Sequence, residues 1–360
     1  MERTGGDGLS AVLDSLRVPV IQAPMAGGPS TPRLSAAVCE AGGLGFLAAG
    51  YRSAAQLADD LNELRALTSA PFGVNLFVGG VDAADAPALA RYLTELGAEA
   101  EHRGVALGEA RFDDDGWEGK LAVLEVDAPA VVSFTFGCPS ADTLRRIKAA
   151  GSEAWVTVTS AAEAERAALA GADALVLQGS EAGGHRGAFT DAEDEEPVGL
   201  LALIALVRAR TELPIVACGG IMDGATAAAV LVAGAKAAAL GTAFMRAPEA
   251  GTVAAQREAM AKPGRTALTR AFSGRSARGI VNRFQREHPD APSAYPQIHH
   301  ATSPLRAAAR AAGDADGFNL WAGQAFALGR ECGAGELVAA LAVELQRALR
   351  GAAERYADAP

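Results

Sequence analysis

Cysteine is scarce in this sequence, with only four residues among 360. They stand far apart, and no two of them have the spacing of a zinc site or of a disulfide framework: Cys39, Cys138, Cys218 and Cys332. We therefore interpret them as small buried residues in a reducing compartment. The sequence predicts a cytoplasmic location and no bound metal.

Long apolar runs and an excess of positive charge are also missing. No stretch approaches the roughly 20 apolar residues of a membrane helix, and Met1 to Ser15 lacks the pattern of a secretory signal. The net charge is −11, and an acidic chain repels nucleic acids and anionic membranes. We therefore expect a soluble protein whose partners are small molecules.

Short apolar runs alternate with alanine-rich amphipathic segments along most of the chain. The runs are apolar throughout, as expected of parallel strands that are covered on both faces. The eight predicted strands are Pro19–Pro24, Gly45–Ala49, Phe72–Val78, Val131–Phe136, Trp155–Thr159, Leu175–Gln178, Ile215–Cys218 and Ala237–Gly241.

Helix signals stand between these runs. Ser53 opens a predicted helix that ends at Leu67, and Asp223 opens one that ends before Gly234. Ser160, with Glu163 three residues later, predicts a capping box. Eight strand–helix units favour an α/β fold of the (β/α)8 TIM barrel type, with an open parallel sheet as the alternative.

Two segments depart from the regular repeat. The spacing from Phe72 to Val131 is about twice the usual one, which predicts an extra helix within residues 81–126. Residues 249–316 follow the eighth strand and are rich in arginine and proline, which predicts a smaller cap domain over the barrel mouth. The barrel domain is then predicted at 1–248 and 317–360, with its eighth helix near Gly335–Gly351.

Glycines follow the seventh and eighth strands, where ligands bind in such barrels. Gly219 and Gly220 end the seventh strand, and Gly241 with Thr242 ends the eighth. Glycine lets backbone N–H groups approach an anion closely. Plain turn glycines are the alternative, but two matched loops favour a phosphate site.

The loop after the sixth strand, Gln178 to Gly187, is rich in glycine and carries His185. A histidine at this face can exchange a proton or stabilise a developing anion, so we predict a catalytic role. The other histidines lack such a setting and are interpreted as surface or cap residues: His102, His288, His299 and His300.

The first and third strands carry the remaining candidates. Pro24 stiffens the end of the first strand, and Met25 offers a soft apolar face for a flat ring. Asn75 is an amide within an apolar strand, where it needs a hydrogen-bond partner in the protein or in a ligand.

Taken together, these residues resemble the nitronate monooxygenase family, formerly called 2-nitropropane dioxygenases. The resemblance extends from residue 20 to residue 324. Its pieces are Gln22-Ala23-Pro24-Met25, Pro71 to Asn75, Gln178 to Gly187, Cys218-Gly219-Gly220-Ile221, Gly241-Thr242, Phe272-Ser273-Gly274-Arg275 and Trp321-Ala322-Gly323-Gln324.

The resemblance implies an FMN-binding barrel with a cap, in which His185 is the active-site histidine above the flavin. Asn75 and Gln178 would hydrogen-bond the flavin's polar edge or ribityl chain, and several glycines would hold the phosphate end. The implied cofactor residues are Ala23, Pro24, Met25, Asn75, Gln178, Gly183, Gly184, Gly219, Gly220, Gly241, Thr242 and Gln324. Ala239 departs from the family, which often has glutamine there, and Tyr295 is a candidate for the substrate cavity.

The leading functional prediction is oxidation of alkyl nitronates, such as propionate 3-nitronate, with O2 to a carbonyl product and nitrite. One alternative is an FMN-dependent enoyl-(acyl carrier protein) reductase, for which cap arginines could bind the NAD(P)H phosphates: Arg275, Arg278 and Arg283. A non-catalytic flavin-binding protein and a non-redox barrel enzyme are further alternatives. A homodimer is also possible.

Overall fold

The computed structural model describes residues 10–191 and 196–356, and its centre is a sheet of eight parallel strands. Their order is β1-β9-β8-β6-β5-β4-β3-β2. Hydrogen bonds between Leu44 and the first strand, at Val20 O and Gln22 N, bring the two sheet edges together into a barrel. The strands are β1 Val20–Gln22, β2 Phe46–Ala48, β3 Gly73–Phe77, β4 Val131–Thr135, β5 Glu153–Val158, β6 Ala174–Gln178, β8 Ile215–Cys218 and β9 Ala237–Leu240. All eight predicted strands are confirmed.

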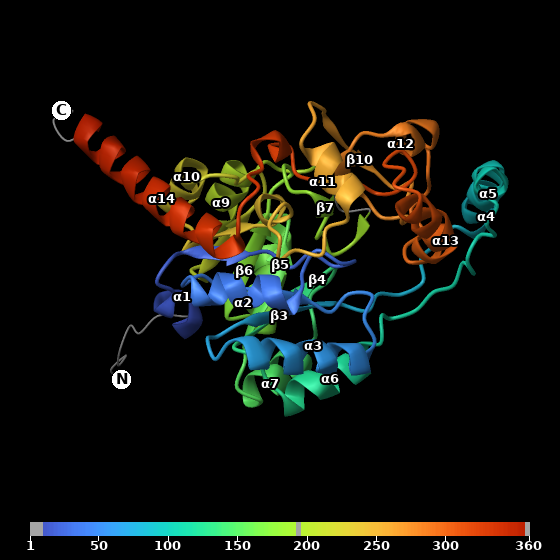
Figure 1. Ribbon diagram of the computed structural model, residues 1–360. Helices are drawn as coiled ribbons and strands as arrows, with labels where there is room; N and C mark the ends of the chain where they lie inside the picture. The colour runs from blue at the N-terminus through green and yellow to red at the C-terminus, as the bar shows by residue number, and fades with distance from the viewer. Residues whose placement is uncertain (1–9, 192–195, 357–360) are drawn as a thin grey trace.

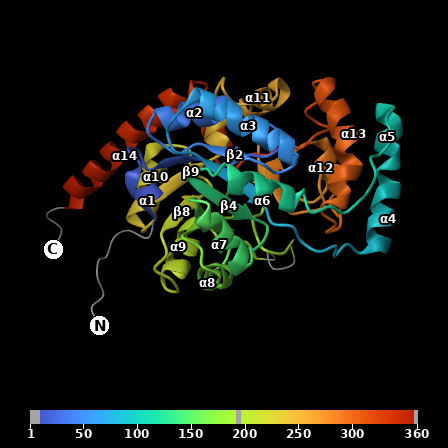
Figure 2. The same ribbon diagram turned by 90° about the horizontal axis from the view of Figure 1, so that it is seen from below.

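Helices surround the barrel, as Figures 1 and 2 show. The long C-terminal helix packs between α10 (Gly224–Val232) and α2 (Pro32–Glu40) and therefore supplies the eighth barrel helix, as predicted. Inside the barrel, Phe46, Trp155 and Val216 form part of a closed apolar core. The helices are α2 Pro32–Glu40, α3 Ala54–Leu67, α6 Trp117–Val126, α7 Ala141–Ala149, α8 Ala161–Ala170, α9 Leu200–Arg208, α10 Gly224–Val232 and α14 Ala334–Tyr356, with the short α1 Ala11–Ser15 at the start. The predicted TIM barrel is confirmed.

The helix-start signals are confirmed in two cases and corrected in one. Ser53 and Asp223 form full capping boxes at α3 and α10. At α8, Ser160 Oγ accepts a hydrogen bond from Glu163 N, but the Glu163 carboxylate turns elsewhere. It accepts hydrogen bonds from the backbone of Thr159 and Phe189, both at 2.6 Å. The predicted reciprocal box is wrong because this buried carboxylate ties down the loop after β6 instead.

A second, three-stranded antiparallel sheet lies beside the carboxyl ends of the barrel strands. It has the order β10-β11-β7, with β10 Thr266–Thr269, β11 Ala277–Ile280 and β7 Gly184–His185. Three helices accompany it: α11 Ala254–Met260, α12 Arg283–Glu287 and α13 Gln297–Ala311. Since β7 belongs to the loop that follows β6, this sheet joins the cap segment directly to the barrel.

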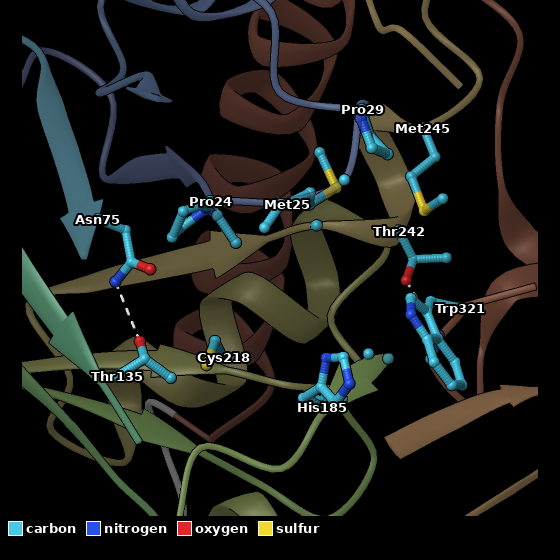
Figure 3. Close-up of a pocket in the computed structure, with 18 of the residues that line it drawn as sticks. Pro24, Met25, Pro29, Asn75, Thr135, His185, Cys218, Thr242, Met245 and Trp321 are labelled. Carbon is cyan, nitrogen blue, oxygen red and sulfur yellow. Dashed lines mark hydrogen bonds between the residues drawn. The ribbon is translucent and has the colours of Figure 1, made fainter. Parts of the chain in front are cut away.

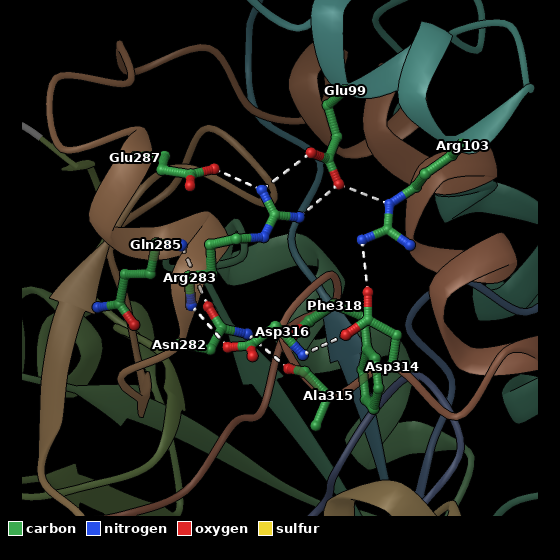
Figure 4. A network of polar contacts seen from close by, with 10 residues as sticks. All are labelled: Glu99, Arg103, Asn282, Arg283, Gln285, Glu287, Asp314, Ala315, Asp316 and Phe318. Atoms are coloured by element: carbon green, nitrogen blue, oxygen red, sulfur yellow. Dashed lines mark hydrogen bonds and ion pairs between the residues drawn. The ribbon is translucent and has the colours of Figure 1, made fainter.

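The long connection between β3 and β4 contains more than the one extra helix predicted. Besides the barrel helix α6, it forms α4 Ala86–Glu95 and α5 Gly97–Arg103, which pack against α13 (Figure 1). An ion network around the buried Glu99 and Arg103 fixes this contact. Glu99 accepts hydrogen bonds from Arg103 (2.6 Å) and Arg283 (2.8 Å), and Arg103 also donates to Asp314 (Figure 4). Helices α4 and α5 are thus bound to the cap side of the molecule.

The four cysteines are free thiols, of which Cys39 is buried and the other three are partly exposed. Burial raises the pKa of the Cys39 thiol to about 11 and that of Cys218 to about 12. Among the described helices, none has the length and apolar character needed to cross a membrane.

Candidate active site

A cavity of ≈ 400 Å³ opens at the carboxyl ends of the barrel strands. Its walls come from the ends of β1, β3, β6, β8 and β9 and from the cap side of the molecule (Figure 3). The structure brings together at this cavity nearly all of the predicted site residues: Ala23, Pro24, Met25, Asn75, Gln178, Gly183, Gly184, His185, Gly219, Gly220, Gly241 and Thr242.

Gln324 lies differently from the others. Its side chain is exposed, and the cavity wall is formed instead by its neighbours Gly323 and Ala325. The backbone N–H of Gln324 donates to Glu181 O at 3.0 Å, which ties this segment to the loop after β6. The structure therefore gives position 324 a backbone contact and no side chain in the cavity.

The glycine loops have the geometry of a close backbone approach. Gly219 and Gly220 have φ of 120° and 70°, a region that L side chains rarely adopt. Gly241 has an ordinary φ of −101°, and a Cβ there would lie 3.5 Å from the Met25 sulfur. Beside it, Thr242 Oγ1 accepts a hydrogen bond from Gly323 N at 3.0 Å, so its own O–H can donate to a ligand.

The side chain of Asn75 is held in place by hydrogen bonds to the neighbouring strand β4. Its Nδ2 donates to Ser133 O (3.2 Å), to Ser133 Oγ (2.9 Å) and to Thr135 Oγ1 (3.0 Å). These bonds fix the amide so that its oxygen lies on the side of the cavity where Pro24 stands (Figure 3). Asn75 thus presents an acceptor to the cavity.

The hydrogen bonds of Gln178 favour a different role from the one the resemblance implied. Its Oε1 accepts from Arg186 Nη1 (3.0 Å) and Gly187 N (2.8 Å), and its Nε2 donates to His185 O (3.0 Å). The amide is largely engaged with the histidine loop, so its evident task is to hold that loop in place.

His185 is positioned by the barrel and the cap together. The β7 residue pairs with Ala277 of β11, while Gln178 at the end of β6 holds its carbonyl. Its ring Nε2 lies 2.8 Å from Ser273 Oγ, and Ser273 Oγ lies 3.3 Å from Arg275 O. The ring is therefore fixed by a short polar chain that comes from the cap.

His185 is neutral at physiological pH. Burial, followed by the positive charges of Arg275 and Arg306, lowers the pKa of His185 to about 3. A neutral imidazole can donate from one ring nitrogen and accept at the other. Any net positive charge in this cavity therefore has to come from arginine.

Aromatic rings form a layer around His185. The ring of His185 lies 5.4 Å from that of Trp321 and 5.9 Å from that of Tyr295 (centroid distances). Tyr295 donates to the Tyr51 hydroxyl at 3.2 Å, and Tyr51 stacks on His299 at 4.1 Å. Burial raises the pKa of Tyr51 to about 12, so both hydroxyls stay protonated.

His299 is a cavity residue that the sequence analysis placed among surface or cap histidines. It belongs to α13, and one face of this helix lines the cavity with His299, Ser303, Arg306 and Arg310. These positions are spaced by four, three and four residues, which is the spacing of a single helix face. This spacing in the sequence indicates that the four residues share a helix face. It does not indicate that the face lines the cavity, because that depends on how α13 docks on the barrel.

Residues with a strained backbone lie beside the aromatic layer that surrounds His185. Tyr51, Asp115 and Phe136 are the non-glycine residues with positive φ in the described part of the chain, at 66°, 57° and 75°. They all line a second cavity that adjoins the first across Tyr51 and Phe136. Asp115 accepts from Tyr51 N (2.9 Å) and from the buried Lys120 (2.6 Å), so the strain is held by an ion pair. Such strain is typical of functional sites.

The three cap arginines considered for a nicotinamide site are engaged separately. Arg275 donates to the backbone of Arg186 and Ala188. Arg278 donates to Ser180 O at 2.9 Å, and Arg283 takes part in the ion network of Figure 4. The structure disperses these arginines instead of forming a shared basic patch.

The fold and this site define an α/β barrel with a cavity at the carboxyl ends of its strands, lined by glycine loops and by His185. The model of the family described as nitronate monooxygenase matches residues 10–344. The chain belongs to the nitronate monooxygenase family, which makes it a flavin-dependent oxidoreductase.

Two curated relatives are close over almost their whole length. A nitronate monooxygenase of Pseudomonas aeruginosa is 44% identical over 92% of this chain and 97% of its own. A nitronate monooxygenase of Paraburkholderia phytofirmans is 42% identical over 96% and 98%.

Two solved structures resemble this chain over nearly its whole length. A nitroalkane oxidase from Streptomyces ansochromogenes superposes with a TM-score of 0.93 at 50% identity, over 95% of this chain and all of its own. FabK from Thermotoga maritima is more distant, with a TM-score of 0.74 at 25% identity, over 96% and 99%.

Proposed function

We propose that this protein binds FMN in the cavity and oxidises alkyl nitronates, such as propionate 3-nitronate, with O2 to a carbonyl product and nitrite. The observation that carries the proposal is the convergence of His185 and the glycine loops after β8 and β9 on one cavity. Membership of the nitronate monooxygenase family supports the same chemistry.

The cavity residues fit a flavin mononucleotide. Gly184 has φ of 78° and open space where a Cβ would stand, while Gly219 and Gly220 also have positive φ. One set of backbone N–H groups suits one phosphate, as FMN carries. Ala23, Pro24 and Met25 would line the flat ring, and Gly220, Gly241 and Thr242 would hold the phosphate. When bound, the flavin supplies the electron acceptor for the substrate and the electron donor for O2.

The protein's own part is to orient the substrate and exclude water. Ser273 Oγ donates to Arg275 O, which can only accept, so the bond between Ser273 and His185 is donated by His185 Nε2. His185 then carries its proton on Nε2, and its Nδ1 can accept a hydrogen bond or a proton. The aromatic layer of Tyr51, Tyr295 and Trp321 limits the solvent around that bond.

The second candidate is the FMN-dependent enoyl-(acyl carrier protein) reductase, the alternative that the sequence left open. It would need a second surface for the phosphates of NAD(P)H. The separate engagement of Arg275, Arg278 and Arg283 weighs against that surface. A flavin-binding protein without turnover would leave the fixed geometry of His185 unused.

The test begins with the cofactor of the purified protein. We expect a yellow protein that releases one FMN per chain on acid treatment. We then expect nitrite and a carbonyl product from propionate 3-nitronate in air. FAD in place of FMN would refute the cofactor proposal, and absence of nitrite would refute the reaction.

Three further features stay predictions: the homodimer, the cytoplasmic location and a cap of residues 249–316. Light scattering, fractionation and limited proteolysis, respectively, can check them.

A further inference from the structure

Two arginines on one helix face place positive charge in the cavity wall. Arg306 and Arg310 both belong to α13 and both line the cavity. Arg306 is only 7% exposed. Burial of a charged group is costly unless an opposite charge or several hydrogen bonds compensate it. The groups that hydrogen-bond Arg306 and Arg310 therefore indicate what kind of ligand the cavity can bind.

The acceptors that the described residues offer to the pair are neutral. Arg306 donates to Thr302 Oγ1 (3.0 Å), to His299 O (2.7 Å) and to Asn319 Oδ1 (3.4 Å). Arg310 donates from one Nη to the same Asn319 oxygen at 2.7 Å. Arginine has five N–H donors, so most of those of Arg310 are left for a ligand.

Two other buried cations have carboxylate partners, whereas the buried Arg275 and Arg278 donate to backbone carbonyl groups. Arg103 is paired with Glu99 and Asp314, and Lys120 is paired with Asp115. The pKa values of both Arg306 and Arg310 are lowered, whereas a neighbouring carboxylate would raise them. Burial, followed by the charge of Arg310, lowers the pKa of Arg306 to about 10. An anion bound between the two guanidinium groups would reverse that effect.

The arginine pair lies one aromatic layer away from the histidine. Arg306 Nη2 lies 3.3 Å from His299 Nδ1, His299 stacks on Tyr51, and the Tyr295 ring adjoins that of His185. The charge of Arg306 is felt at His185. A small substrate could therefore place its reacting end at His185 and a second charged end at the arginines.

We propose that Arg306 and Arg310 bind the carboxylate of the substrate and thereby select nitronates that carry a second anionic group. The inference rests on the proposed function and adds the residues that set its specificity. The planar fork of a guanidinium matches the two oxygens of a carboxylate, which gives both energy and orientation. The glycine loops after β8 and β9 offer the flavin phosphate its own site, so the pair is not needed there.

The test compares two substrates that share the reacting group. Propionate 3-nitronate carries the carboxylate, and propyl 1-nitronate has a methyl group in its place. For the wild-type holoenzyme we expect kcat/KM to favour propionate 3-nitronate. In Arg306→Met the ratio of the two kcat/KM values should fall about 30-fold or more, mainly through KM, as expected for a lost charge-assisted contact. Arg306→Lys should recover part of the ratio, and Arg145→Met on the exposed face of α7 should leave it unchanged.

Flavin content and direct binding keep this test separate from the reaction. FMN per chain should be the same in Arg306→Met, and loss of FMN would show that the pair serves the flavin phosphate instead. Calorimetry should show that succinate binds the wild-type holoenzyme more tightly than butyrate, and that Arg306→Met removes the difference.

The two proposals can fail separately. An Arg306-dependent succinate site without nitronate turnover would keep the subsite and overturn the proposed function. Turnover of both nitronates with equal kcat/KM, and no preference for succinate, would overturn the subsite alone.

Discussion

The two walls of the cavity are built in different ways. The barrel wall consists of strand ends and glycine loops, with Asn75 as a fixed acceptor and backbone N–H groups at Gly220 and Gly241. The wall from α13 carries long polar side chains, among them His299 and Arg306. The first wall suits a cofactor that stays in place, whereas the second carries the charge that can select a substrate.

His185 stands where the two walls meet, and it is held by both. Gln178 fixes its carbonyl from the barrel, and Ser273 fixes its ring from the cap. Changes in the barrel wall should therefore affect flavin content, and changes in the cap wall should affect kcat/KM at constant flavin content.

Gly241→Asp should abolish flavin binding and leave the fold intact. A carboxylate beside the phosphate is repelled by several kcal/mol in a partly dry site. Gly241→Ala is the matched control, because its Cβ would make only ordinary contact with Met25. Flavin absorbance per chain and circular dichroism measure the two properties. Gly220→Asp should lose flavin too, but φ of 70° there adds backbone strain. A Gly241→Asp protein that keeps one FMN per chain would place the phosphate elsewhere.

His185→Ala should keep its flavin and lose about 100-fold to 10,000-fold in kcat/KM, as expected when a hydrogen-bonding or proton-transfer group is removed. The exposed His102→Ala is the control. Because the pKa of His185 is about 3, kcat/KM should show no titration of this group between about pH 5 and 8. Full activity in His185→Ala would remove the histidine from the reaction.

Ser273→Ala tests the hydrogen bond that comes from the cap. Loss of the contact at 2.8 Å frees the His185 ring, so we expect kcat to fall about tenfold at unchanged flavin content. Ser273→Thr keeps a hydroxyl group and should retain more activity than Ser273→Ala. Equal activity in wild type and Ser273→Ala would show that the barrel alone positions the histidine.

Glu99→Gln tests how firmly α4 and α5 are tied to the cap. Removing this charge leaves Arg103 without its nearest partner, which should cost about 3 kcal/mol locally. Hydrogen exchange should rise in residues 86–103 and stay unchanged in the barrel strands. The exposed pair Asp142–Arg145 is the control, since Asp142→Asn should cost less than about 0.5 kcal/mol.

The same network predicts an acid effect. Burial opposes ionisation of Glu99, but Arg283 and Arg103 hold its pKa below the usual value. A carboxyl group with a lowered folded-state pKa stabilises the fold above its unfolded pKa, and that contribution is lost as pH falls through the folded value. Exchange in residues 86–103 should therefore rise below about pH 4 in the wild type and much less in Glu99→Gln.

The barrel could be predicted from the sequence because each strand and its loop are local patterns. The apolar runs located all eight strands, and the glycines after the runs located two loops that line the cavity. The part played by His299 could not be predicted in this way, because it depends on how α13 docks across the barrel mouth. Gln178 was found as a cavity residue, but its engagement with Gly187 depends on how the loop folds back.

Two side chains point elsewhere than their sequence patterns suggest, and the physical cause is the same. Glu163 follows Ser160 at capping-box spacing, yet its carboxylate binds Phe189 N in a loop 26 residues away. Gln324 lies in a family motif, yet its side chain faces solvent while Gly323 lines the cavity. A motif locates a segment, whereas the direction of a side chain depends on contacts with distant parts of the chain.

An anaerobic spectrum of the bound flavin tests the proposed reaction directly. Propionate 3-nitronate should reduce the flavin rapidly, and admission of O2 should restore the oxidised spectrum and release nitrite, whereas NADH and NADPH should reduce it slowly. Rapid reduction by NADPH, with no response to the nitronate, would contradict the account and favour the enoyl reductase.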